Sequence, residues 1–180
     1  MGNNMELNYD MFCYQCEQTA GGKGCTKLGV CGKTPEVAGL QDLLIFQIKG
    51  ISCYAKELLD KGEHISKDIV KFIENSLFTT LTNVNFDPEA HVKLLKESQK
   101  IKEELRTHVR KPAIDTAHAS YDLPDTKTEM LKDAPIAGIM YDANLDPDIR
   151  SLRQTIVYGL KGISAYGHQA RELGYYSDSV

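Results

Sequence analysis

Hydrophobic residues recur at helical spacing through most of the chain that follows residue 34. The first such stretch begins after Thr34, a candidate helix cap with Pro35 at the first helical position, and it ends at Gly62. Apolar residues return there every three or four positions, as on the buried face of an amphipathic helix. The pattern therefore predicts a long helix over residues 35–61.

Two further helices are expected before residue 110. Ser66 is a candidate cap for the stretch 67–83, whose apolar side chains fall on one helical face. Asp87-Pro88 opens the stretch 88–109, in which Lys/Glu pairs suit a solvent-facing side. Together with the long helix, these stretches predict a first helical unit over residues 34–110.

The periodicity lapses between Lys111 and Asp146, where prolines, a glycine and several aspartates interrupt the chain. We expect a linker over residues 111–146 that carries one short helix near 127–132. Asp146-Pro147 then repeats the Asp-Pro start signal, and a last long helix is expected to run to Gly174. Residues 147–180 are the predicted start of a second helical unit, and the predicted fold class is all-α.

The two long helices share a sequence pattern. At a constant offset, LQDLLIFQIKGISCYAKELLDKG at residues 40–62 aligns with LRQTIVYGLKGISAYGHQARELG at residues 152–174, and both contain KGIS. This similarity favours two units built on one plan, although two amphipathic helices could also have converged. Gly50 and Gly162 lie in mid-helix, where each costs about 1 kcal/mol relative to alanine. We therefore expect close helix-helix approach at both glycines.

Composition and charge narrow the class of protein. The 180 residues are 42% hydrophobic and 26% charged, as in an ordinary globular protein, and the formal net charge is -4. Basic residues are interleaved with acids over residues 98–110, which argues against a nucleic-acid surface. The predicted N-terminal extension, residues 1–10, lacks the features of a signal sequence, and the longest apolar stretch is too short to span a membrane. We expect a cytoplasmic protein without nucleic-acid or membrane partners.

Four of the five cysteines lie in one glycine-rich stretch, CYQCEQTAGGKGCTKLGVC, within a predicted loop over residues 11–33. Their spacing is C-x2-C-x8-C-x5-C, from Cys13, Cys16, Cys25 and Cys31. A reducing compartment disfavours disulfides, so metal binding is the leading interpretation. Five residues separate Cys25 from Cys31, where a paired zinc knuckle would have two. This spacing favours an iron-sulfur cluster over zinc and leaves zinc, disulfide and redox thiols open. The helix that begins near Pro35 would direct free N–H groups toward such an anionic cluster.

The remaining candidate residues carry weaker signals. Cys53 aligns with Ala165 in the repeat and is interpreted as a core thiol outside the site. The five histidines are scattered singly, so we expect them to be surface residues or hydrogen-bonded core residues. Tyr14 and Gln15, inside the first cysteine pair, are expected to pack over the bound group.

The segments MFCYQCEQTAGGKGCTKLGVCGK and DIRSLRQTIVYGLKGISAYGHQARELG resemble the amino-terminal region of the hybrid-cluster protein family, also called prismane proteins or hydroxylamine reductases. The resemblance spans most of residues 11–174. It implies two three-helix-bundle-like units in tandem, preceded by the cysteine-rich loop. It also implies one 4Fe-4S cluster held by Cys13, Cys16, Cys25 and Cys31.

The resemblance further implies a role in electron transfer. The family reduces hydroxylamine to ammonia at a hybrid cluster whose Cys, His and Glu ligands lie in later domains. Only YYSDSV follows Gly174 here, so the second unit is truncated relative to the family and those ligands are absent. We expect this chain to be inactive alone and to take electrons from a redox donor protein, with the remaining hybrid-cluster domains on another chain as a second partner. The alternative is a structural zinc-binding helical interaction module.

Overall fold

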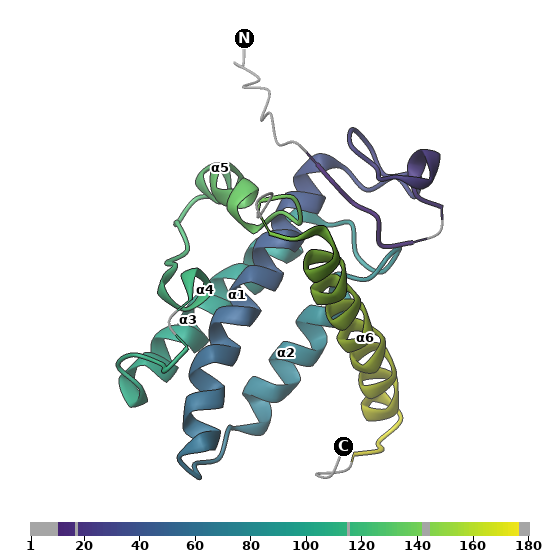
Figure 1. Ribbon diagram of the computed structural model, residues 1–180. Helices are drawn as coiled ribbons and strands as arrows, with labels where there is room; N and C mark the ends of the chain where they lie inside the picture. The colour runs from purple at the N-terminus through teal and green to yellow at the C-terminus, as the bar shows by residue number, and fades with distance from the viewer. Residues whose placement is uncertain (1–10, 17, 115, 142–144, 177–180) are drawn as a thin grey trace.

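The computed structural model describes residues 11–16, 18–114, 116–141 and 145–176, and its regular structure is helical. The helices of these residues are α1 (Pro35–Asp60), α2 (Lys67–Thr79), α3 (Pro88–His108), α4 (Ala117–Ser120), α5 (Lys127–Ala137) and α6 (Pro147–Glu172), with a 3-10 turn, η1, at Ala20–Gly22 (Figure 1). The all-α prediction is confirmed. The predicted N-terminal extension, residues 1–10, and the final residues 177–180 lie outside the described residues.

The long helices begin at the residues that the cap signals indicated. The Thr34 hydroxyl accepts a hydrogen bond from the Val37 amide over 3.3 Å, and the Ser66 hydroxyl accepts one from the Ile69 amide over 3.3 Å. Asp87 and Asp146 cap α3 and α6 in the same way, each followed by a proline at the first helical position. These caps satisfy amide groups that a helix start would otherwise leave without a partner.

The ends of α1, α3 and α6 lie within two residues of the predicted ends, whereas those of α2 and α5 differ more. Helix α2 ends at Thr79 and not at residue 83, because the Thr80 amide bonds to the Leu77 carbonyl and Asn83 adopts a left-handed conformation with φ 62°. The predicted short helix near 127–132 continues to Ala137 as α5, with Pro135 inside its last turn. The four-residue helix α4 lacks a periodic signal and was not expected.

Helix α1 is the centre of the packing and contacts α2, α3, α4 and α5 (Figure 1). One buried cluster joins its first half to α3 and α5, and a second joins its other half to α2, α3 and α4. Burial of one such Leu or Ile side chain contributes about 1.5–3 kcal/mol. The clusters include Ala119, Met130 and Leu131 from the predicted linker, so helices α4 and α5 of that segment belong to the core around α1. The division of the chain into two units stays a prediction.

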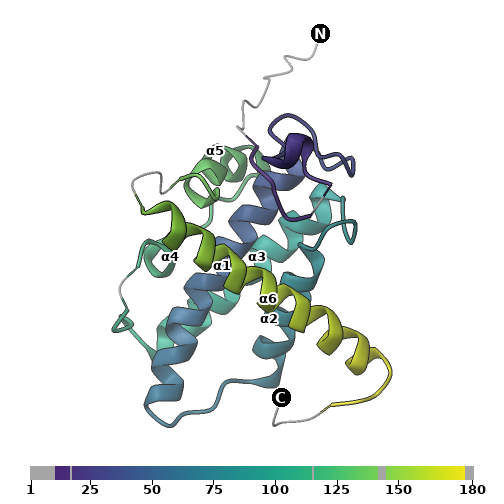
Figure 2. The same ribbon diagram turned by 45° about the vertical axis from the view of Figure 1, so that its right-hand side comes forward.

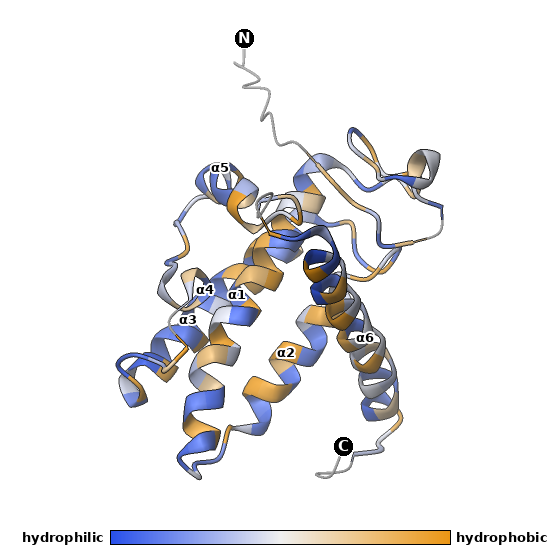
Figure 3. Ribbon diagram, viewed as in Figure 1, coloured by the Kyte–Doolittle hydropathy of each residue, from blue (hydrophilic) through white to orange (hydrophobic). Residues whose placement is uncertain are grey.

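Helix α6 crosses the other helices and packs against α2 (Figure 2). Arg171 forms an ion pair with Glu74 at 2.5 Å, and the His168 ring stacks on Phe78 with 4.5 Å between ring centroids. Hydrophobic residues recur along α6 (Figure 3), yet many of them, such as Leu152 and Ile163, are exposed. No helix within the described ranges has the length and apolarity needed to cross a membrane.

The two mid-helix glycines have different surroundings. A Cβ atom at Gly50 would lie 2.3 Å from the backbone oxygen of His118, so the expected close helix-helix approach is confirmed there, with α4 as the neighbour. At Gly162 a Cβ atom would meet nothing within 4 Å. The expectation of close packing at Gly162 is therefore wrong for the part of the chain that the structure describes.

Candidate metal centre in the cysteine loop

The predicted cysteine loop, residues 11–33, lies at the amino-terminal end of α1, beside the segment that joins α2 to α3 (Figure 1). Cys13, Cys16, Cys25 and Cys31 all carry free thiols. Cys25 is buried and the other three are partly exposed. The structure distributes these four thiols over two pairs.

Cys13 and Cys25 form the first pair. Each donates its amide to the other's carbonyl, over 3.0 Å and 2.7 Å, as in a two-residue antiparallel bridge. Residues opposed in this way point their side chains to the same face, with Cβ atoms about 5 Å apart. Both side chains pack with Met11 and with Ala38 from the first turn of α1. The expected proximity of the start of α1 to the cysteines is thus present for this pair.

Cys16 and Cys31, here called the second pair, both line a cavity of about 310 Å³. Thr82 and Asn83, from the connection between α2 and α3, line the same cavity. Gly29 lies against Cys31, since a Cβ atom at Gly29 would be 3.1 Å from Cys31 Sγ and 3.0 Å from Lys33 Cβ. A larger residue at this position would press on the Cys31 thiol and on Lys33, so glycine suits the position.

Among the described residues, the structure contains no group of three or more Cys, His, Asp or Glu side chains that could hold a metal ion. The chemistry of the donors nevertheless fits an iron-sulfur cluster, because four free thiols share one loop and four thiolates are the usual ligands of a cubane cluster. Four thiolates would equally suit structural zinc. The convergence of the two pairs on one metal group stays a prediction.

Buried polar residues connect the loop to the helical core. Lys33 is 2% exposed and donates to Gln41 Oε1 over 2.6 Å. Gln41 Nε2 lies 3.2 Å from His91 Nε2, and the other ring nitrogen of His91 bonds the Asp87 carbonyl over 2.7 Å. Burial raises the pKa of the Cys13 thiol, whereas a backbone hydrogen bond at Gln15 and the charge of Lys33 act in the opposite direction. Deprotonation of Cys13 therefore depends on nearby positive charge or on a bound metal.

Tyr14 and Gln15 attach the loop to α6. The Tyr14 ring meets Tyr158 edge-on with 5.9 Å between centroids, and Gln15 Oε1 accepts a hydrogen bond from Lys161 over 3.0 Å. The prediction that both residues pack over a bound group is untested, and the contacts seen are with α6. Sequence reasoning missed Lys33 and Lys161, although the lysine of the repeated KGIS segment was a signal for the second.

Cys53, His91 and His118, which were not predicted as site residues, have the contacts of ordinary core residues. Cys53 is half-buried, and its Sγ lies 3.5 Å from the Thr116 hydroxyl, away from the other cysteines. His91 is buried with a partner for each ring nitrogen, as expected of a hydrogen-bonded core histidine. His118 packs against Phe46 with 4.2 Å between ring centroids.

The all-α core and the four free thiols in the loop before its central helix define the class of protein: a helical protein with a cysteine-rich amino-terminal loop. Comparison with known protein families identifies the family of this chain. The Prismane/CO dehydrogenase family matches residues 11–180, and the chain belongs to this family.

Several proteins of known name are similar in sequence to this chain. The chain is 44% identical to a hydroxylamine reductase of Syntrophobacter fumaroxidans over 174 residues, which cover 94% of the chain and 32% of that protein. It is 44% identical over 170 residues to a hydroxylamine reductase of Bacteroides thetaiotaomicron, with 94% and 30% covered. For that of Thermoanaerobacter pseudethanolicus the identity is 41% over 173 residues, with 94% and 31% covered. The chain thus spans about a third of the length of these relatives.

Proposed function

We propose that Cys13, Cys16, Cys25 and Cys31 hold one 4Fe-4S cluster and that the chain is an electron-transfer domain related to the amino-terminal part of hydroxylamine reductases. The observation that supports this most directly is the presence of four free thiols on one loop in a member of the Prismane/CO dehydrogenase family. When bound, the cluster would supply one-electron transfer without an open coordination site.

The residues of the chain have separate tasks in this proposal. The four thiols are the ligands, and Gly29 leaves room for the Cys31 sulfur. The buried Ala38 packs the first turn of α1 against the Cys13–Cys25 pair. Lys33 offsets part of the negative charge that the thiolates carry.

Reduction of hydroxylamine to ammonia belongs, in this proposal, to residues beyond the third of the relatives that the chain covers. The partners would be a reduced electron-donor protein and the remaining hybrid-cluster domains. We place the protein in the cytoplasm, where a reducing environment keeps the thiols free for a metal.

Metal analysis tests the proposal. Anaerobically purified protein should contain about four irons per chain and show a broad visible absorption that dithionite bleaches, as cubane ligation by four thiolates implies. Serine in place of any one ligand, for example Cys25→Ser, should remove most of the iron. The matched control is Cys53→Ser, which should retain it. A colourless protein with one zinc per chain would instead support the zinc-binding interaction module.

A further inference from the structure

A buried lysine of α6 contacts the cysteine loop. Lys161 is 1% exposed, and its ammonium donates to Gln15 Oε1 over 3.0 Å, across 146 positions of sequence. Gln15 lies between Cys13 and Cys16 in the chain. The hydrogen bond therefore holds the positive charge of Lys161 beside the segment that carries Cys13 and Cys16.

The lysines of the two KGIS segments line the same small cavity. Lys49 of α1 and Lys161 of α6 are equivalent in the repeat, and both line a cavity of about 20 Å³ together with Asp42 and Gln15. A space of this size accommodates a single water molecule and not a phosphate-sized anion. The lysines therefore do not form a pocket for a separate anionic ligand.

The charged side chains around Lys161 are mostly positive. Lys33, Lys49 and Lys161 lie close enough to interact electrostatically, and Asp42 is the carboxylate that acts on Lys161. Burial lowers the pKa of Lys161 to about 8, while Asp42 acts in the opposite direction. Fully buried lysines are rare unless they are paired, because an ammonium loses its hydration. An anionic thiolate-ligated cluster in the adjoining loop would compensate this cost.

We propose that Lys161 supplies a fixed positive charge that raises the reduction potential of the cluster held by the cysteine loop, with Gln15 keeping the ammonium in place. This inference rests on the proposed function. During reduction one electron leaves the donor, which is oxidised, and enters the cluster, with no bond made or broken. A nearby ammonium stabilises the added negative charge and so favours the reduced form.

Redox titration of the loaded full chain tests this role. Lys161→Met removes the charge and keeps an unbranched side chain, whereas Lys161→Arg retains the charge. At the wild-type midpoint potential, the ratio of reduced to oxidised cluster should fall about tenfold in Lys161→Met, which equals about 59 mV for a one-electron couple. Lys161→Arg should remain within about twofold of wild type. Lys56→Met, at an exposed lysine paired with Asp60, is the control for loss of a distant charge.

The outcomes separate this inference from the proposed function. Equal midpoint potentials for wild type and Lys161→Met at the same iron content would overturn the inference and leave the cluster assignment standing. A wild-type chain that binds no iron after anaerobic reconstitution would overturn both. If Lys161→Met does not fold, as judged by circular dichroism, Lys161→Gln replaces it, because glutamine removes the same charge and can still hydrogen-bond Gln15. A midpoint potential of Lys161→Gln equal to that of wild type would then overturn the inference.

Discussion

At the scale of single residues, Gly50 and Gly162 give the sharpest contrast, because they occupy one position of the repeat in two environments. The backbone oxygen of His118 fills the space over Gly50, whereas the space over Gly162 is open. The same substitution should therefore have opposite effects at the two sites.

Gly50→Ala should lower the free energy of unfolding by about 2 kcal/mol or more, since the new methyl group meets backbone that cannot rotate away. Gly162→Ala should raise it by about 1 kcal/mol through better helix propensity. Urea unfolding followed by circular dichroism measures both. Destabilisation of equal size at the two glycines would contradict the assigned surroundings.

His118 should make the stability of the fold depend on pH. Burial lowers its pKa to about 4, from about 6.5 in an unfolded chain. The unfolded state therefore binds more protons between these values, and the free energy of unfolding should fall as the pH drops from 6.5 to 4. Because His118 is partly exposed, we expect a loss of about 1–2 kcal/mol at pH 4.5. Unfolding of wild type and His118→Gln across this range measures the difference, and parallel pH profiles would exclude His118 as the cause.

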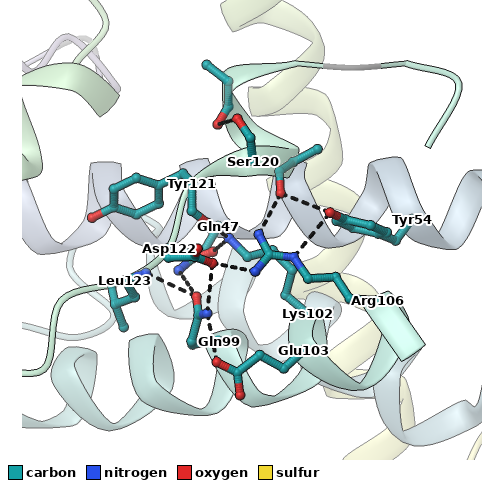
Figure 4. Close-up of polar contacts among 12 residues, drawn as sticks. Gln47, Tyr54, Gln99, Lys102, Glu103, Arg106, Ser120, Tyr121, Asp122 and Leu123 are labelled. Atoms are coloured by element: carbon teal, nitrogen blue, oxygen red, sulfur yellow. Dashed lines mark hydrogen bonds and ion pairs between the residues drawn. The ribbon is translucent and has the colours of Figure 1, made fainter. Parts of the chain in front are cut away.

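At the scale of the elements, polar side chains of α3 fasten the segment around α4 to the core (Figure 4). Arg106 donates from Nε to the Tyr54 hydroxyl over 3.1 Å and from Nη2 to the Ala119 carbonyl over 2.9 Å, and it pairs with Asp122. Lys102 donates to Gln47 Oε1 over 2.5 Å and to the Tyr121 carbonyl. These bonds replace the periodic hydrophobic contacts that this segment lacks.

Arg106→Met should therefore lower the free energy of unfolding by about 1–2 kcal/mol, mostly through the lost hydrogen bonds to Tyr54 and Ala119. The Asp122 carboxylate is largely exposed, so its ion pair should contribute little to the change. Lys96→Met, at an exposed position of the same helix, is the matched control. Equal denaturation midpoints for the two variants would show that α3 does not hold this segment through Arg106.

Comparison of particular elements shows what the sequence could predict. The starts of α1, α2, α3 and α6 followed from local caps and prolines. The spacing of the four cysteines made them candidate ligands, and their role as ligands stays a prediction. Helix α4 did not follow from local signals, because it is held by Arg106 and Lys102 from a distant helix and has no periodicity of its own. The hydrogen bond between Lys161 and Gln15 could not be predicted from local sequence either, since it joins residues 146 positions apart. Local signals predicted elements and candidate ligands, whereas long-range polar contacts required the structure.

At the scale of the whole molecule, the exposed face of α6 corresponds to the buried face of α1. Leu152 is 64% exposed and Ile163 is 67% exposed, while their repeat equivalents Leu40 and Ile51 are both 0% exposed. On α1 these positions pack against the surrounding helices. In the part of the chain that the structure describes, no helix covers this face of α6, which agrees with the prediction that residues 147–180 begin a second helical unit.

This view predicts opposite consequences for equivalent substitutions. Ile51→Glu should prevent folding, because it buries an unpaired carboxylate, whereas Ile163→Glu should change the free energy of unfolding by less than about 0.5 kcal/mol. When the chain is mixed with the separately expressed remainder of a hydroxylamine reductase relative, Ile163→Glu should bind at least about tenfold more weakly than wild type, since it places a charge in the apolar contact. Leu59→Glu, at an exposed position of α1 outside this face, is the matched control. Equal affinity of Ile163→Glu and wild type in a pull-down titration would show that the covering helices bind elsewhere.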